Sequence, residues 1–161
     1  MIIVSNTSPI NYLLLIEQIK ALPELFGTIV VPTAVITELM HPGAPEPARI
    51  WAKSLPDWVE IRNAARVDPM FSRTLGFGEA ATISLALEIR ADFVLLDDLK
   101  ARKAALARGL SVAGTLNILD AAADRKLLNF EQAITGLLGT NFRCSTELLR
   151  RVLEGRRGRQ P

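Results

Sequence analysis

Four short apolar runs without polar alternation are the feature that most constrains the fold of this 161-residue chain. The runs occupy residues 2–4, 29–31, 58–61 and 93–96, and a weaker fifth run covers residues 110–112. Uniformly apolar runs of this length are typical of parallel strands that are covered on both faces. Because helical patterns separate them, the sequence predicts an α/β fold, a three-layer α/β/α sandwich with a central parallel sheet of about five strands.

The helical patterns predict eight helices and one domain. We expect the helices at residues 8–16, 33–40, 46–54, 79–90, 98–108, 115–126, 130–138 and 145–153. The helix at 79–90 is apolar nearly all round, so we expect it to be deeply buried. No composition shift divides the chain, which predicts a single domain over residues 1–154 followed by a mobile basic tail at 155–161.

The small net charge of +2 hides an uneven distribution. Residues 143–161 hold six arginines against two glutamates, so this segment carries +4 and residues 1–142 carry −2. A negatively charged RNA backbone is the natural counterpart of such a tail. We therefore predict nucleic-acid contacts from Arg156, Arg157 and Arg159, with a merely solubilising tail as the alternative.

Several classes of protein are excluded by what the chain lacks. Cys144 and His41 are the only residues of their types, which leaves no disulfide, no cysteine-based zinc site and no Ser-His-Asp triad. No apolar stretch approaches the ~20 residues that span a bilayer. No basic residue precedes Lys20, so a signal peptide is not expected and we predict a cytoplasmic protein that does not contact membranes.

Polar residues follow the first and fourth apolar runs, where a parallel sheet places its binding sites. Asn6 follows the first run, Asp97 and Asp98 follow the fourth, and Glu38 and Glu79 lie on flanking helices. If these two strands are neighbours, the side chains converge, and clustered carboxylates favour a hard ion such as Mg²⁺ or Mn²⁺. Taken singly, each acid has an alternative role as a helix cap, a first-turn acid or a solvated surface residue.

A glycine pattern at residues 76–81 requires a separate interpretation. The residues match G-x-G-x-x-A, and Asp97 and Asp98 follow about 20 residues later, as in dinucleotide-binding folds. The preceding residues 69–75 do not resemble a strand, however. We therefore interpret Gly78 as part of the entry to the buried helix.

Four segments in register resemble the PIN-domain family of metal-dependent nucleases, which includes VapC-type toxins of toxin–antitoxin pairs. The segments are residues 3–10, 31–39, 78–86 and 94–102. The similarity covers about residues 1–125 and is greatest to PIN-like proteins that open with Ser-Asn-Thr-Ser-Pro. It implies a PIN-like fold and a Mg²⁺- or Mn²⁺-dependent endoribonuclease that acts on RNA, with the toxin of a toxin–antitoxin pair as one role found in the family.

The resemblance also implies a set of site residues. Catalytic and metal-binding roles fall on Asn6, Glu38, Glu79 and Asp98, with Asp97 adjacent. Supporting hydroxyls are expected from Ser8 and Thr7, and nucleic-acid contacts from the nearby Lys100 and Arg102. A toxin would further imply an antitoxin that covers the acidic cleft. Separately, the helices over residues 130–153 are candidates for a homodimer face, with ordinary core packing as the alternative. The apolar residues concerned are Leu137, Leu138, Leu148, Leu149 and Val152.

Asn6 departs from the family pattern, because most active relatives have Asp at this position. An amide oxygen can bind a metal but adds no charge, which weakens the site. Two further hypotheses follow: a catalytically weakened PIN-like module that binds RNA or a protein, and a generic α/β domain in which the acids are structural.

Overall fold

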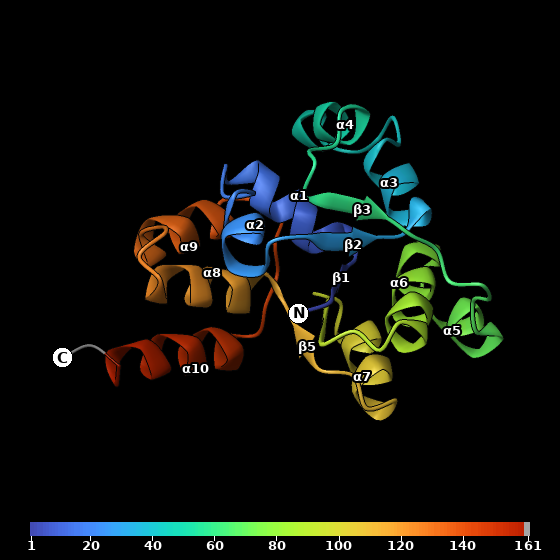
Figure 1. The fold of residues 1–161 in the computed structure, drawn as a ribbon. Coiled ribbons are helices and arrows are strands. Elements are labelled where there is room, and N and C mark those ends of the chain that lie inside the picture. The colour runs from blue at the N-terminus through green and yellow to red at the C-terminus, as the bar shows by residue number, and fades with distance from the viewer. Residues whose placement is uncertain (160–161) are drawn as a thin grey trace.

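The computed structural model describes residues 1–159 and contains one five-stranded parallel sheet. The strand order is β3-β2-β1-β4-β5. This confirms the predicted three-layer α/β fold (Figure 1). The strands are β1 (Ile3–Ser5), β2 (Ile29–Val31), β3 (Val59–Ile61), β4 (Phe93–Leu95) and β5 (Val112–Ala113).

The sheet carries two hydrophobic cores because its strand residues alternate between faces. Ile3 and Leu95 belong to one core, whereas Val4 and Val94 belong to the other. The helices that pack in the first core are α1 (Thr7–Leu15), α2 (Ala21–Phe26), α3 (Thr33–Leu39), α4 (Glu46–Lys53), α8 (Thr115–Asp124) and α9 (Phe130–Leu138). Those that pack in the second core are α5 (Pro69–Thr74), α6 (Phe77–Glu88) and α7 (Leu99–Ala107).

Helix α6 is the most deeply buried helix, as its composition predicts. Eight of its residues are buried, including Ala80, Ile83 and Leu85, which are fully inaccessible to solvent. The helix packs directly against β1 and β4 as well as α5 and α7. Within residues 1–159, no helix is both long and apolar enough to cross a membrane.

Two helices were not expected from the sequence. Helix α2 has six residues and places Leu22 and Leu25 in the first core. Helix α5 lies in the segment that precedes the glycine pattern, where Asp68 accepts a hydrogen bond from the Met70 amide and Phe71 is buried. Both helices are too short for helical periodicity to be visible in the sequence.

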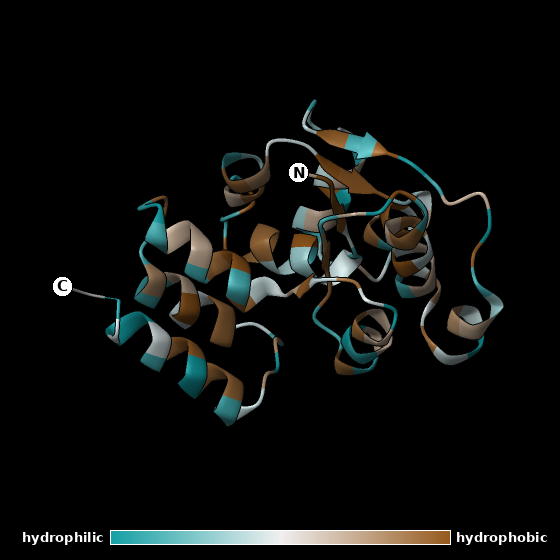
Figure 2. Ribbon diagram, turned by 60° about the horizontal axis from the view of Figure 1, so that its bottom comes forward, coloured by the Kyte–Doolittle hydropathy of each residue, from teal (hydrophilic) through white to brown (hydrophobic). Residues whose placement is uncertain are grey.

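The last helix, α10 (Thr146–Arg157), extends past the expected end of the domain at residue 154. Its outer face is hydrophilic, whereas its inner face packs against α8 (Figure 2). Arg156 holds this end in place through Asp120 at 2.8 Å and Asp124 at 3.1 Å. The predicted tail therefore begins as helix, and its residues 160–161 lie outside the described part of the chain.

The predicted dimer face is largely used within the domain itself. Leu137 is fully buried, and Leu148, Leu149 and Val152 pack against the first core. Leu138 alone of the five is exposed, at 47% of its surface. Ordinary core packing, the alternative interpretation of this leucine pattern, accounts for the other four.

Candidate metal and nucleic-acid site

Strands β1 and β4 are hydrogen-bonded neighbours, as the convergence of the predicted site residues requires. Ser5 is paired in register with Leu95, and the Asn6 amide donates to the Leu95 carbonyl at 3.0 Å. Asn6 and Asp97 therefore leave the sheet at the same edge. We call this carboxyl edge, with Asn6, Glu38, Glu79, Asp97 and Asp98, the rim.

Glu38 is held at the rim by groups from two other elements. One carboxylate oxygen accepts a hydrogen bond from the Thr7 hydroxyl, and the other accepts from the Gly78 amide at 2.9 Å. A Cβ atom at position 78 would lie only 2.5–2.7 Å from the Glu38 carboxylate. Glycine at this position therefore allows the close approach that fixes Glu38.

Glu79 lies in the first turn of α6, where its Oε2 accepts from the Gly76 amide at 3.0 Å. Burial raises the pKa of Glu79 above its usual value, and the Gly76 hydrogen bond opposes this rise. The carboxylates of Asp98 and Glu38 raise the pKa further, whereas Lys100 lowers it. Glu38, Glu79 and Asp98 thus form a group of mutually repelling acids.

Asn6 is almost completely buried, with 3% of its surface exposed. Its side chain does not cap α1, although it occupies the N-cap position. Instead, its Oδ1 faces α6 and lies 3.5 Å from the Thr82 hydroxyl, which itself donates to the Gly78 carbonyl at 2.7 Å. Ser8 lies half-buried in the first turn of α1, so of the two predicted supporting hydroxyls Thr7 is the one bonded to a rim carboxylate.

The adjacent acids Asp97 and Asp98 have different surroundings. Both Asp97 oxygens accept from Thr115, one from its amide and one from its hydroxyl, each at 2.7 Å. Burial raises the pKa of Asp97, while the two Thr115 bonds and Arg102 lower it. Asp98 is exposed and caps α7, accepting from the Ala101 amide through Oδ1 alone. Asp97 is thus committed to α8, whereas Asp98 retains a second oxygen.

The predicted basic contacts divide into two groups. Lys100 and Arg102 lie at the start of α7, next to the rim, and Arg102 donates to the Leu96 carbonyl at 2.8 Å. Arg156 and Arg159 instead form ion pairs with Asp120 and Asp124 of α8. Arg157 ends α10, and the structure brings none of these three tail arginines into a hydrogen bond or ion pair with a rim residue.

The rim fits Mg²⁺ or Mn²⁺ by donor chemistry, because all its polar side chains offer oxygen atoms. Glu79 Oε1 and Asp98 Oδ2 accept no hydrogen bond within residues 1–159, so they are available as ligands. The described residues nevertheless contain no group of three His, Cys, Asp or Glu side chains already placed to hold a metal ion. Glu38 would have to exchange at least one of its present hydrogen bonds to act as a third ligand.

The glycine pattern at residues 76–81 does not form a dinucleotide site. Helix α5 precedes it, where a nucleotide-binding unit requires a strand. Gly76 instead occupies the N-cap position of α6, and Gly78 lies in the first turn, which agrees with the interpretation of Gly78 as part of the entry to this helix.

Sequence reasoning did not identify Thr82, Thr115 or the role of Gly78. Thr82 and Thr115 are fully buried polar residues whose partners at the rim, Asn6 and Asp97, lie 76 and 18 positions away in the chain. Of the three, only Gly78 could have been noticed in the sequence, because it directly precedes Glu79 and glycine is often used where two backbone segments or a side chain approach closely.

The fold and the rim together define a parallel α/β domain with an acidic site at the carboxyl edge of its sheet. A family model described as PIN domain (DUF3368) matches residues 2–156. The chain therefore belongs to the PIN domain family, whose members are generally nucleases and typically bind Mg²⁺. Comparison with curated proteins and with solved structures gave no significant match.

Proposed function

We propose that this protein is a metal-dependent endoribonuclease whose rim binds Mg²⁺ or Mn²⁺. The observation that carries the proposal is the placement of three acids at one edge of the sheet: the Gly78 amide holds Glu38 next to Glu79 at the start of α6, and Asp98 follows β4, the neighbour of β1. Carboxylates without ion-pair partners at the carboxyl edge of a parallel sheet offer the oxygen ligands that a divalent cation prefers. The choice of RNA follows the resemblance to ribonuclease toxins and the family's nuclease character.

The metal, when bound, would supply a Lewis acid for the phosphodiester and lower the pKa of the attacking water. Glu38, Glu79 and Asp98 are the proposed ligands. Asn6 contributes a neutral oxygen near the same edge. Thr7 and Gly78 orient Glu38, and Asp97 anchors the start of α8 through Thr115.

A catalytically weakened module that binds RNA is the second candidate. It is favoured by Asn6, which removes one negative charge from the rim, and by the commitment of both Glu38 oxygens to hydrogen bonds. Under this alternative the rim keeps its shape but holds a metal too weakly for turnover.

An antitoxin that covers the rim and a homodimer are two further proposals about partners. A partner that inserts Lys or Arg between the rim carboxylates would neutralise their repulsion. A homodimer would need a face other than the leucines of α10, since these pack within the domain.

The two candidates are separated by an RNA cleavage assay with Mg²⁺, with Mn²⁺ or with a chelator. A nuclease requires cleavage by the wild type that the chelator and Glu38→Gln both abolish, with the exposed Glu60→Gln as a matched control. If only Asn6→Asp cleaves, the weakened module is correct. A DNA strand of the same sequence tests the preference for RNA.

A further inference from the structure

A pocket of about 410 Å³ adjoins the rim on the side of α8 and α10. Asp97 and Asp98 form the boundary that it shares with the rim. Nothing in the proposed metal chemistry uses the rest of the pocket. Its other walls include Arg102, Leu116, Phe142, Arg143 and Leu148.

Among the described residues, two guanidinium groups line the pocket without forming an ion pair, although Arg102 is near enough to Asp97 to lower its pKa. Arg102 donates to the Leu96 carbonyl and Arg143 to the Phe142 carbonyl, at 2.8 and 3.0 Å. Within residues 1–159, neither forms an ion pair with Asp or Glu. Each therefore keeps donors for an anionic ligand, and a guanidinium matches the geometry of a phosphate.

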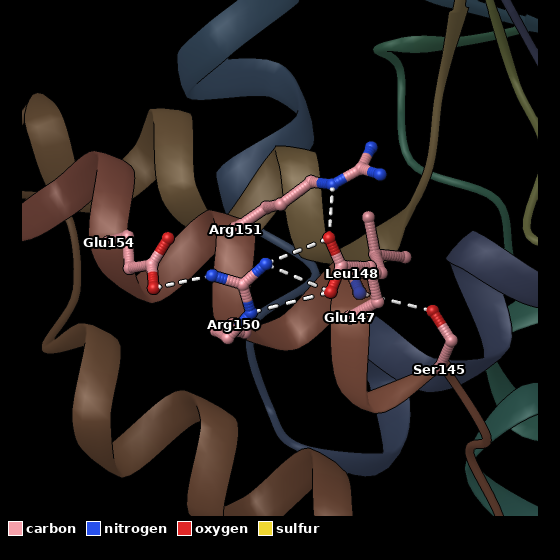
Figure 3. A network of polar contacts seen from close by, with 6 residues as sticks. All are labelled: Ser145, Glu147, Leu148, Arg150, Arg151 and Glu154. Carbon is pink, nitrogen blue, oxygen red and sulfur yellow. Dashed lines mark hydrogen bonds and ion pairs between the residues drawn. The ribbon is translucent and has the colours of Figure 1, made fainter.

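Arginines elsewhere in the C-terminal segment provide a contrast. Arg150 lies between Glu147 and Glu154, and Arg151 binds Glu147 as well (Figure 3). These arginines lie on the exposed face of α10 and are neutralised by their own helix. Arg102 and Arg143 thus line the pocket next to the rim without ion pairs in the described chain, whereas Arg150 and Arg151 of α10 are compensated.

The remaining wall of the pocket is mostly apolar, with Asn117 and Ser145 as its polar residues. Leu116 and Phe142 are 3% and 5% exposed, and Leu148 is half-buried. The ring of Phe142 is fixed by an edge-on contact with Tyr12 at 5.0 Å between ring centroids. The pocket therefore combines a rigid apolar wall with two cationic groups, which suits a ligand with a flat apolar part and a phosphate.

The start of three helices adds to the positive character of the pocket. Residues Leu99 of α7, Leu116 of α8 and Leu148 of α10 line it, and each lies within the first turn of its helix. The positive ends of three helix dipoles thus face the same space as the two arginines.

We propose that this pocket binds one nucleotide of the RNA strand that crosses the rim. Arg102 and Arg143 hold its phosphate, and Leu116, Phe142 and Leu148 contact its base. The identity of the strand rests on the proposed function, whereas nucleotide binding itself does not. The pocket would place the neighbouring phosphodiester beside Glu79 and Asp98.

The test measures binding to the full-length protein in the presence of a chelator, by amide chemical shifts. The probes are adenosine monophosphate, inorganic phosphate and a five-nucleotide RNA. We expect shifts at residues 114–117 and 142–148, with the RNA binding more tightly than the mononucleotide. Arg143→Ala should weaken nucleotide binding by about tenfold or more, the loss of one charge-assisted hydrogen bond, and Arg150→Ala should change it by less than about twofold.

The base contact has its own variant. Leu148→Ala should weaken binding of the mononucleotide and leave that of inorganic phosphate unchanged, with the folded state checked by circular dichroism. The proposal is overturned if nucleotides cause no shifts at these residues, if Arg143→Ala binds like wild type, or if phosphate alone binds as tightly as the nucleotide.

Failure of the pocket and failure of the nuclease proposal give different results. A protein that binds nucleotides with the chelator present but never cleaves RNA keeps the pocket and loses the nuclease. A protein that cleaves RNA while Arg143→Ala has no effect on binding or KM loses the pocket alone.

Discussion

The rim and helix α10 are both rich in charged residues, but in the described part of the chain most of those on α10 form ion pairs whereas the acids of the rim do not. On α10, acids and arginines alternate and pair within the helix, as Arg150 does with Glu147 and Glu154. At the rim, Glu38, Glu79 and Asp98 lie close together, and none of the ion pairs within residues 1–159 includes them. Uncompensated like charges cost stability. Such a cost is expected where a site is prepared for an oppositely charged ligand.

The close approach of Gly78 to the Glu38 carboxylate is the feature of the rim that one added methyl group would disrupt. Gly78→Ala would put a Cβ atom against the Glu38 carboxylate, which must then move away. We expect RNA cleavage to fall by about a hundredfold, as for a catalytic group displaced by about 1 Å. The free energy of unfolding should change by at most about 1 kcal/mol, because the end of the Glu38 side chain is able to swing aside.

Gly155→Ala is the matched control on α10. A Cβ atom there meets nothing within 4 Å, so alanine should stabilise the helix by about 0.5–1 kcal/mol and leave cleavage unchanged. Equal cleavage by Gly78→Ala and wild type would show that the position of Glu38 does not matter for activity.

Asp97 differs from the other rim acids, because both of its oxygens accept hydrogen bonds from a single buried residue, Thr115. Asp97→Ala would leave the amide and hydroxyl of Thr115, which is fully buried, without their acceptors. We expect the free energy of unfolding to fall by about 2 kcal/mol, measured by urea denaturation. A variant as stable as wild type would remove the structural role given to Asp97.

On the α10 side, Arg156 is the residue that attaches the helix. Its side chain is 16% exposed, pairs with Asp120 and Asp124, and lies over the Phe130 ring at 4.5 Å. Arg156→Ala should lower the free energy of unfolding by about 1 kcal/mol. Arg150→Ala, whose ion pairs are exposed, should give no measurable change in thermal unfolding, and an equal loss in both variants would contradict this difference.

The sequence predicts the parallel sheet from local patterns, whereas the convergence at the rim was conditional on the long-range pairing of the first and fourth strands, which the structure supplies. Uniformly apolar strands indicate their own burial, and the adjacency of β1 and β4 brings Asn6 to the edge that Asp97 and Asp98 share. The distinction between Asp97 and Asp98 was beyond the sequence, since it depends on Thr115, 18 residues away. Likewise, the composition of residues 143–159 shows six positive charges but cannot show that Asp120 and Asp124 of α8 compensate two of them.

The smallest expected effect is on the pH dependence of stability, and it tests the mutual repulsion of the rim acids directly. Since the pKa of Glu79 is raised in the folded protein, folding favours its protonated form. Its contribution to stability is therefore complete below the unfolded value of 4.5 and is lost as pH rises through the folded value. Glu79→Gln should accordingly flatten the dependence of stability on pH in this window.

Asp98→Asn tests whether the charge of Asp98 contributes to the raised pKa of Glu79. The variant keeps the N-cap of α7, because asparagine and aspartate cap helices equally well. Removing its charge should lower the pKa of Glu79 towards 4.5, whereas the exposed Asp57→Asn should not. Carboxyl carbon shifts followed through a pH titration measure both variants. An unchanged pKa in Asp98→Asn would mean that burial and Glu38 account for the shift, and Asp98 would no longer belong to the group of repelling acids.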